Sequence, residues 1–239
     1  MRIGKPTRTV KRKGMGFETR AIHVGQAPDP ATGAVIVPIH QTSTYAQKAV
    51  GEHKGFDYSR TANPTRSALE SCLASLESAT YGFAFSSGMG AITTLFHLLS
   101  PGERVISVND VYGGTYRLFK GVYEPKGYEF EYLSTEKLIA SVAEHLDEWT
   151  RFVWLETPTN PLLNVVDIGA VVEKAHTYGA LVVVDNTFAT PYLQRPLELG
   201  ADIVVHSTTK YLGGHSDVVG GFAATNDQVI AERLAFLQN

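Results

Sequence analysis

The stretch Ala180-Leu-Val-Val-Val-Asp185 decides the fold class, because it is apolar without interruption until a carboxylate ends it. Strands that are hydrophobic at consecutive positions are buried on both faces, as in parallel sheets that helices cover. A segment of helical periodicity, 167–179, precedes this strand, and Ile203-Val-Val-His206 follows as a second strand of the same kind. Strands and helices that alternate in this way predict an α/β fold with a mainly parallel sheet.

The same alternation extends back along the chain to residue 65. Further strands are expected at 81–86, 104–108, 128–133 and 152–155, and further helices at 65–76, 87–99, 116–122 and 138–149. Thr65 is the expected N-cap of the first of these helices. Residues 65–239 are therefore predicted to form one α/β domain. Residues 1–64 contain several prolines and little helical periodicity, so we expect an extended arm that packs on another body, such as a second subunit.

Composition narrows the class of protein. Of 239 residues, 44% are hydrophobic, which is enough for a sizeable core. The 21 basic and 24 acidic side chains give a net charge of −3, whereas nucleic-acid binders usually carry a basic excess. One cysteine, Cys72, excludes an internal disulfide framework, and the eight histidines show no metal-binding spacing.

The sequence shows no pattern typical of a secretory signal or a membrane span. The basic residues between positions 2 and 13 are not followed by an apolar segment, so a solvated arm is expected rather than a secretory signal. No apolar run approaches the ~20 residues that span a bilayer. We expect a soluble cytoplasmic protein that binds neither nucleic acid nor membrane, and no metal.

Polar groups follow three of the expected strands, where α/β sheets bind ligands. Ser86-Ser-Gly-Met-Gly90 leads from a strand into a helix, whose free N–H groups can bind a phosphate. An ordinary strand-to-helix turn would look the same, and the motif lacks the lysine of a Walker A loop. Asp185 ends the apolar strand that follows Ala180, although a helix cap or an Asx turn also explains an aspartate there. His206-Ser-Thr-Thr-Lys-Tyr211 places hydroxyl groups before Lys210.

Together these groups fit one cofactor. Lys210 can form a Schiff base with an aldehyde. Asp185 can pair with a protonated pyridine nitrogen. The glycine turn can bind a phosphate together with Ser207 and Thr209. About one strand–helix–strand unit separates Asp185 from Lys210, which puts both at neighbouring strand ends. An aldehyde, a pyridinium and a phosphate on one ligand describe pyridoxal 5′-phosphate.

Longer motifs make the resemblance specific. The chain resembles the Cys/Met-metabolism branch of the fold-type I pyridoxal-phosphate enzymes, which includes cystathionine γ-synthase, cystathionine γ-lyase, cystathionine β-lyase and methionine γ-lyase. The matching stretches run in family order from about residue 17 to the C-terminus: Pro38-Ile-His-Gln-Thr-Ser-Thr-Tyr45, Tyr58-Ser-Arg-Thr-Ala-Asn-Pro-Thr65, Phe85-Ser-Ser-Gly-Met89, Asp110-Val-Tyr-Gly-Gly-Thr115, Glu156-Thr-Pro-Thr-Asn-Pro161, Asp185-Asn-Thr-Phe188 and His206-Ser-Thr-Thr-Lys-Tyr-Leu-Gly-Gly-His-Ser-Asp-Val218. The resemblance implies that residues 65–239 form the large pyridoxal-phosphate-binding domain of this fold.

The resemblance also implies roles around the cofactor ring. Lys210 resembles the lysine that holds the cofactor and later moves protons between substrate carbons. Tyr112 resembles the tyrosine that stacks on the ring, and its phenol can assist proton transfer. Asp185 resembles the partner of the ring nitrogen and Asn160 the amide that binds the phenolic oxygen, with Thr187 as a further neighbour.

Further roles concern the phosphate and the assembly. The backbone at Gly88 and Met89, with the hydroxyls of Ser207 and Thr209, resembles the phosphate cup. Tyr58 and Arg60 resemble a pair that reaches the phosphate from a neighbouring subunit, a role that suits the planar fork of arginine. A homo-oligomer is then expected, with a dimer as the minimum and a tetramer implied by the family.

The implied function is transsulfuration: elimination or replacement at Cγ of cystathionine or an activated homoserine, as in cystathionine γ-lyase and γ-synthase, with the lyase slightly ahead. Asp57 stands where a carboxylate could meet the distal amine of cystathionine. Gly114 occupies a position at which methionine γ-lyases typically carry cysteine, which counts against that activity. Cystathionine β-lyase, O-acylhomoserine sulfhydrylase and methionine γ-lyase stay open as alternatives.

One departure from the family affects turnover. Family members continue for about another domain, which normally supplies the arginine for the substrate carboxylate. We therefore expect a fragment or truncated product that binds the cofactor but turns over poorly. The alternative of another class is a truncated, non-catalytic fragment that binds pyridoxal phosphate. A nicotinamide-dependent oxidoreductase is a third hypothesis, disfavoured by the lack of a G-x-G-x-x-G motif.

Overall fold

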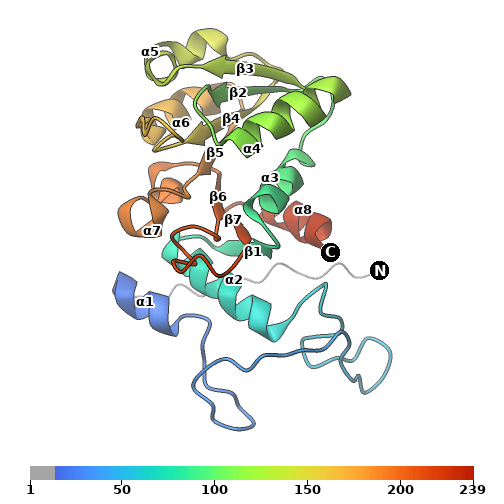
Figure 1. Cartoon of the computed structure of the whole chain (residues 1–239). Helices are drawn as coiled ribbons and strands as arrows, with labels where there is room; N and C mark the ends of the chain where they lie inside the picture. The colour runs from blue at the N-terminus through green and yellow to red at the C-terminus, as the bar shows by residue number, and fades with distance from the viewer. Residues whose placement is uncertain (1–13) are drawn as a thin grey trace.

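A single seven-stranded sheet organises the molecule (Figure 1). The computed structural model describes residues 14–239, so the arm expected at residues 2–13 lies outside the described residues. The strand order is β1-β7-β6-β5-β4-β2-β3, and β7 alone runs antiparallel to its neighbours. The predicted α/β fold with a mainly parallel sheet is confirmed. The strands are β1 Tyr81–Phe85, β2 Arg104–Val108, β3 Glu129–Leu133, β4 Thr150–Glu156, β5 Leu181–Asp185, β6 Ile203–Ser207 and β7 Gly221–Thr225.

Helices cover both faces of the sheet. Figure 1 shows α3, α4 and α8 on one side and α5 and α6 on the other. The α-helices are α1 Phe17–His23, α2 Pro64–Leu76, α3 Gly88–Phe96, α4 Gly113–Leu118, α5 Thr135–His145, α6 Ile168–Thr177, α7 Thr190–Leu193 and α8 Gln228–Gln238. A π-helical turn, η1 Phe119–Tyr123, continues α4, and the short 3₁₀ turns η2 Glu124–Lys126 and η3 Pro196–Leu199 lie in connections. None of the helices in residues 14–239 is long and apolar enough to cross a membrane.

Local sequence explains where the elements begin. Asp167 caps α6, as its side chain accepts a hydrogen bond from the backbone N–H of Ala170 at 3.0 Å. The prediction that Thr65 caps α2 is wrong. The cap is Asn63, because Pro64 takes the first helical position, and the Asn63 side chain accepts a hydrogen bond from the backbone N–H of Thr65 at 2.9 Å. The Thr65 hydroxyl instead donates to the carbonyl of Pro38 at 2.8 Å, which ties the preceding segment to α2.

The core divides into two clusters. The larger one is aromatic at its centre, where Phe96 packs within 4.7 Å of Phe119 and 5.9 Å of Trp154 between ring centroids. The smaller cluster fills the space between α2 and the sheet, with Leu73 of the helix against Val204 and Phe222 of β6 and β7. Adjacent residues of β6 therefore face different clusters, which fixes the side of the sheet on which each side chain lies.

The segment before α2 has little regular structure. Besides α1, which the sequence patterns do not predict, it contains only an isolated bridge between Thr44 and Tyr58 within its described residues. Several of its apolar side chains are exposed, among them Ile36 at 73% and Ile39 at 85%. These exposed apolar groups support the expectation that the segment packs on another body, which stays a prediction.

Candidate active site

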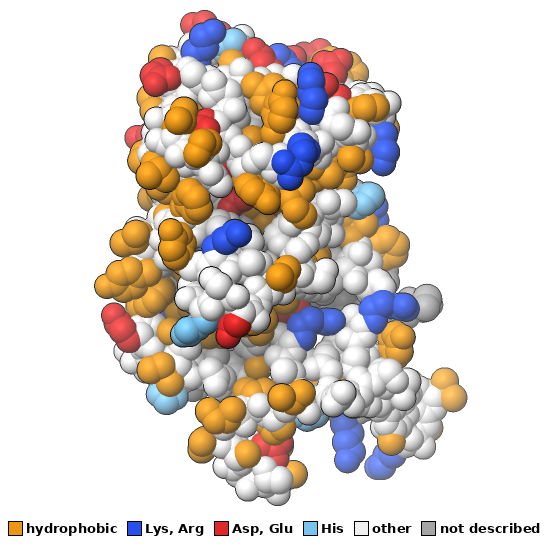
Figure 2. Space-filling view, in the orientation of Figure 1, with side chains coloured by type: hydrophobic (Ala, Val, Ile, Leu, Met, Phe, Trp, Pro, Cys, Tyr) orange, Lys and Arg blue, Asp and Glu red, His pale blue; other side chains and the backbone are white. Residues whose placement is uncertain are grey.

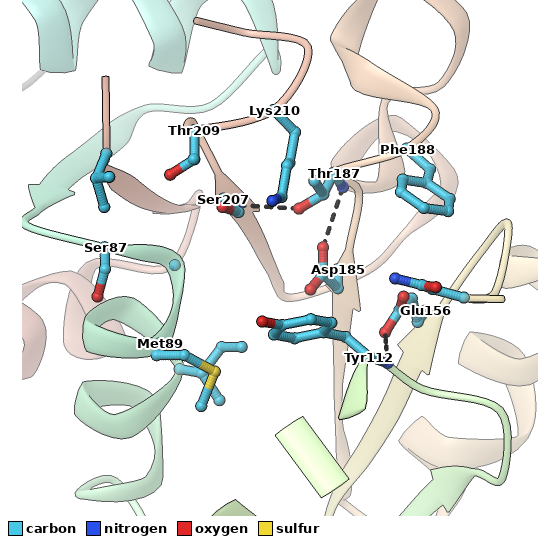
Figure 3. A pocket seen from close by; sticks show the side chains of 14 residues that line it. Ser87, Met89, Tyr112, Glu156, Asp185, Thr187, Phe188, Ser207, Thr209 and Lys210 are labelled. Atoms are coloured by element: carbon cyan, nitrogen blue, oxygen red, sulfur yellow. Dashed lines mark hydrogen bonds between the residues drawn. The ribbon is translucent and has the colours of Figure 1, made fainter. Parts of the chain in front are cut away.

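A cavity of about 510 Å³ opens at the carboxyl ends of the parallel strands (Figure 3). Its lining contains the following predicted site residues: Gly88, Met89, Tyr112, Asn160, Asp185, Thr187, Ser207, Thr209 and Lys210. Its lining also contains residues that were not predicted: Ser87, Ile92, Glu156, Phe188 and Val219. The strand-end rule thus brings separate stretches of sequence to one place.

Asp185 stands at the end of β5 and is 8% exposed. Its Oδ1 accepts the backbone N–H of Thr187 at 3.0 Å, and the Thr187 hydroxyl accepts the backbone N–H of Ser207 at 2.9 Å. Burial raises the pKa of Asp185, and hydrogen bonds from Thr187 oppose that rise. The Asx turn and the cofactor partner are therefore not alternatives, because the same carboxyl makes the turn and faces the cavity.

Glu156 is the main residue that the sequence patterns do not single out. Its Oε2 accepts the backbone N–H of Tyr112 at 2.7 Å, and the side chain is buried beside Asp185. Burial, followed by the negative charge of Asp185, raises the pKa of Glu156 to about 8. The two residues are register partners at the ends of β4 and β5. The argument that selects Asp185, a carboxylate directly after an apolar strand, would have selected Glu156 as well.

The turn between β1 and α3 forms a cradle for an anion. Ser87 caps α3, and its hydroxyl accepts the backbone N–H of Gly90 at 3.0 Å. A Cβ atom on Gly88 would lie 2.8 Å from Cβ of Ser207, so only glycine permits this approach of the turn to β6. The free N–H groups at the start of α3 and the hydroxyls of Ser207 and Thr209 border the same space.

Lys210 and Tyr112 complete the cavity. Figure 3 shows them extending into it from opposite sides, with Asp185 between them in this view. Tyr112 is 43% exposed, and its backbone is held by Glu156. Asn160, from the turn after β4, lies at the same edge.

The chemistry of this lining fits pyridoxal phosphate. A buried carboxylate can face the ring nitrogen, and a helix N-terminus with hydroxyls can hold the phosphate. The amine of Lys210 can reach the aldehyde, and the face of Tyr112 is available to the ring. Because Gly88 has no side chain, the start of α3 can lie against Ser207, which brings its N–H groups and the Ser207 hydroxyl to the same side of the cavity.

Tyr58 and Arg60 do not belong to this cavity. Both are exposed, and the Arg60 guanidinium lies over the Tyr58 ring at 5.1 Å from its centroid. Arg66 of α2 holds the segment through hydrogen bonds to backbone carbonyls, including that of Arg60 at 3.1 Å and that of Thr61 at 2.8 Å. The pair is thus presented outward on an anchored segment.

Comparison with known proteins identifies the family. Residues 18–239 match the family model described as Cys/Met metabolism PLP-dependent enzyme. The chain belongs to this family. It is 56% identical to the probable cystathionine gamma-synthase of Herpetosiphon aurantiacus over 94% of the chain, and 50% identical to the cystathionine gamma-lyase of Bacillus subtilis, also over 94%. The resemblance drawn from the sequence motifs is confirmed.

Solved structures agree with this assignment. The chain superimposes on metB from Corynebacterium glutamicum with a TM-score of 0.92 at 49% identity, covering 94% of the chain and 59% of that structure. For cystathionine gamma-lyase from Lactobacillus plantarum complexed with L-serine, the TM-score is 0.90 at 48% identity, with 94% and 58% covered. The chain spans 70% of the Herpetosiphon relative and 59% of the Bacillus one.

Proposed function

We propose that the chain carries the cofactor site of a pyridoxal-phosphate enzyme that eliminates or replaces a group at Cγ of cystathionine or an activated homoserine. The observation that carries the proposal is the convergence of Lys210, Asp185 and the anion cradle in one cavity. Relatives named cystathionine gamma-synthase and cystathionine gamma-lyase support the reaction class. The lyase stays slightly ahead, with cystathionine β-lyase, O-acylhomoserine sulfhydrylase and methionine γ-lyase as alternatives.

Each residue has a task in this proposal. Lys210 would supply the amine that holds the aldehyde and, when free, the base that moves a proton from Cα of the substrate. It could take a second proton, from Cβ, only after it has given up the first. Asp185 holds the proton on the ring nitrogen. When bound, pyridoxal phosphate supplies the electron sink for the charge left at Cα. Tyr112 covers one face of the ring, and Asn160 binds its phenolic oxygen.

The phosphate is held from two sides in the same proposal. The α3 N-terminus at Gly88 and Met89, with Ser207 and Thr209, binds it within the chain. Tyr58 and Arg60 reach the phosphate of a neighbouring subunit, which makes a homodimer the minimum and a tetramer the expected assembly. The exposed apolar side chains before α2 and the outward position of Arg60 support this arrangement. A cytoplasmic location accompanies the proposal, supported by the use of a single cysteine.

A spectrum of the purified chain tests the cofactor site. We expect a near-visible absorbance band after addition of pyridoxal phosphate, and a mass increase after borohydride that maps to Lys210. Lys210→Ala should lose both, whereas Lys126→Ala, changed in the exposed turn η2, should keep both. A wild-type chain without band or mass increase would refute the proposal.

Product analysis separates the reaction classes. Release of 2-oxobutanoate and cysteine from cystathionine supports γ elimination, whereas release of pyruvate and homocysteine supports β elimination. Formation of cystathionine from activated homoserine and cysteine supports replacement. A borohydride-fixed cofactor without any of these products supports the second candidate, a non-catalytic unit that binds pyridoxal phosphate.

A further inference from the structure

A buried polar cluster lies behind the cavity, between α2 and the sheet. Glu77, which directly follows α2, is 1% exposed, and Asn186 and His206 are 0% and 1% exposed. The Asn186 side-chain amide donates to Oε1 of Glu77 at 2.8 Å, and Nε2 of His206 contacts the same oxygen. Gln194 donates to Oδ1 of Asn186 at 2.9 Å. One carboxylate oxygen therefore holds two side chains from two different strand ends.

The cluster is joined to the cavity through the backbone. Asn186 stands between Asp185 and Thr187, and His206 directly precedes Ser207. Side chains of consecutive strand residues point to opposite faces, so Asp185 and Ser207 face the cavity while their neighbours face α2. The side of α2 is also where Val204, two residues before His206, packs.

Hydrogen bonds on both faces lock the two strand ends together. On the cavity face, the Thr187 hydroxyl accepts the backbone N–H of Ser207 at 2.9 Å. Between the strands, the backbone N–H of Asn186 donates to the carbonyl of Val205 at 3.0 Å. On the far face, Glu77 bridges Asn186 and His206. Removing the bridge would leave buried donors without an acceptor, which forces the side chains and then the backbone to move.

We propose that Glu77 is a positioning residue for the cofactor site. Through Asn186 and His206 it fixes the backbone that presents Asp185 and Ser207 to the cofactor. The inference rests on the proposed function, since the backbone that Glu77 fixes belongs to the proposed cofactor site.

The test compares two substitutions at Glu77. Glu77→Leu removes the shared acceptor. We expect the dissociation constant of pyridoxal phosphate to rise roughly tenfold or more, which is the size of effect found when a residue that orients a ligating group by hydrogen bonding is removed. Glu77→Gln keeps an acceptor oxygen for Asn186, so we expect rescue to within about threefold of wild type. The visible circular dichroism of the bound cofactor, which reports its orientation, should change in the leucine variant and return in the glutamine variant.

A control removes a Glu–His contact far from the cavity, together with the ion pair of the same glutamate, Glu131, with Arg104. Oε1 of Glu131 on β3 lies 2.6 Å from Nδ1 of His145, at the edge of the sheet opposite β1. Glu131→Leu should lower the unfolding temperature without changing the cofactor dissociation constant. A folded Glu77→Leu variant with a wild-type dissociation constant would overturn the proposal. If Glu77→Leu does not fold, Asn186→Ala decides in the same way, because it cuts one arm of the bridge.

Hydrogen exchange of the cofactor-free chain separates this inference from the proposed function. Faster amide exchange at 185–187 and 206–209 in the leucine variant supports the positioning role even if the wild-type chain fails to bind pyridoxal phosphate. In that event the proposed function fails while the support of these strand ends stands. Unchanged exchange in both segments would refute the positioning role itself.

Discussion

Replacing Glu156 by glutamine should make the cofactor-free chain more stable at alkaline pH. The glutamine oxygen can still accept the backbone N–H of Tyr112, which Oε2 of Glu156 accepts at 2.7 Å. The change therefore keeps the hydrogen bond and removes only the ability to ionise. Because Glu156 is 6% exposed and lies beside Asp185, ionisation of its carboxyl is costly in the folded state.

The sign and size of the effect follow from the pKa. The pKa of Glu156 is raised from 4.5 to about 8 in the folded chain. A group with a raised pKa contributes its full stability below the unfolded value, and this stability is lost as the pH rises through the folded value. At about 1.36 kcal/mol per pH unit, the wild-type chain should lose on the order of 5 kcal/mol between about pH 4.5 and pH 8 that Glu156→Gln does not lose.

Urea unfolding of cofactor-free protein from about pH 5 to about pH 9 measures this difference. Glu173→Gln, changed on the exposed side of α6, controls for the loss of a carboxylate as such. In an Asp185→Asn background the pKa of Glu156 should rise less, because the neighbouring charge that raises it is gone. The difference in stability between chains with and without Glu156→Gln should then be smaller and should reach its full size at a lower pH. Parallel stability curves for wild type and Glu156→Gln across the range would refute the reasoning.

Three further predictions concern the core, the cradle and the α2 cap. Phe96→Ala should lower the free energy of unfolding by about 3–5 kcal/mol, since Phe96 is fully buried at the centre of the aromatic cluster; a loss below about 1 kcal/mol in urea unfolding would contradict this. Gly221→Ala should weaken pyridoxal-phosphate binding about tenfold or more in titrations, since its Cβ would lie 2.0 Å from the Ser87 carbonyl oxygen; unchanged affinity would show that the turn adapts. Asn63→Ala should cost about 1 kcal/mol in thermal unfolding, and Asn63→Asp, which keeps an acceptor, should recover most of it; equal losses would argue against capping.

The parts of the fold that sequence predicts are those in which local pattern and burial agree. β5 is apolar at every position before Asp185 and is buried from Val182 onward, so its pattern is unambiguous. β7 was not predicted, because Gly-Phe-Ala-Ala-Thr has few β-branched residues and becomes a strand through pairing on both sides with β1 and β6. The cap of α2 was misplaced because the proline after Asn63 shifts the helix start.

The candidate site divides in a similar way. Position at a strand end suffices for Asp185 and Lys210, since the topology of a parallel sheet brings such positions together. Tyr112 and Asn160 follow from the family resemblance, because an aromatic ring or an amide in a turn carries no chemical pattern of its own. The supporting role of Glu77 depends on contacts across the sheet with residues far along the chain, which periodicity does not encode.

The antiparallel strand has a consequence for synthesis on the ribosome. Among the described residues, the only strand that pairs with β1 is β7, roughly 140 residues later. At translation rates of about 5–20 residues per second, β1 waits roughly 7–30 seconds for its hydrogen-bonding partner to be made. Throughout that interval a nascent chain carries an unpaired strand edge that includes Phe83, a template for pairing with other chains. Chaperone dependence during translation should therefore fall sharply once Thr225 has left the exit tunnel.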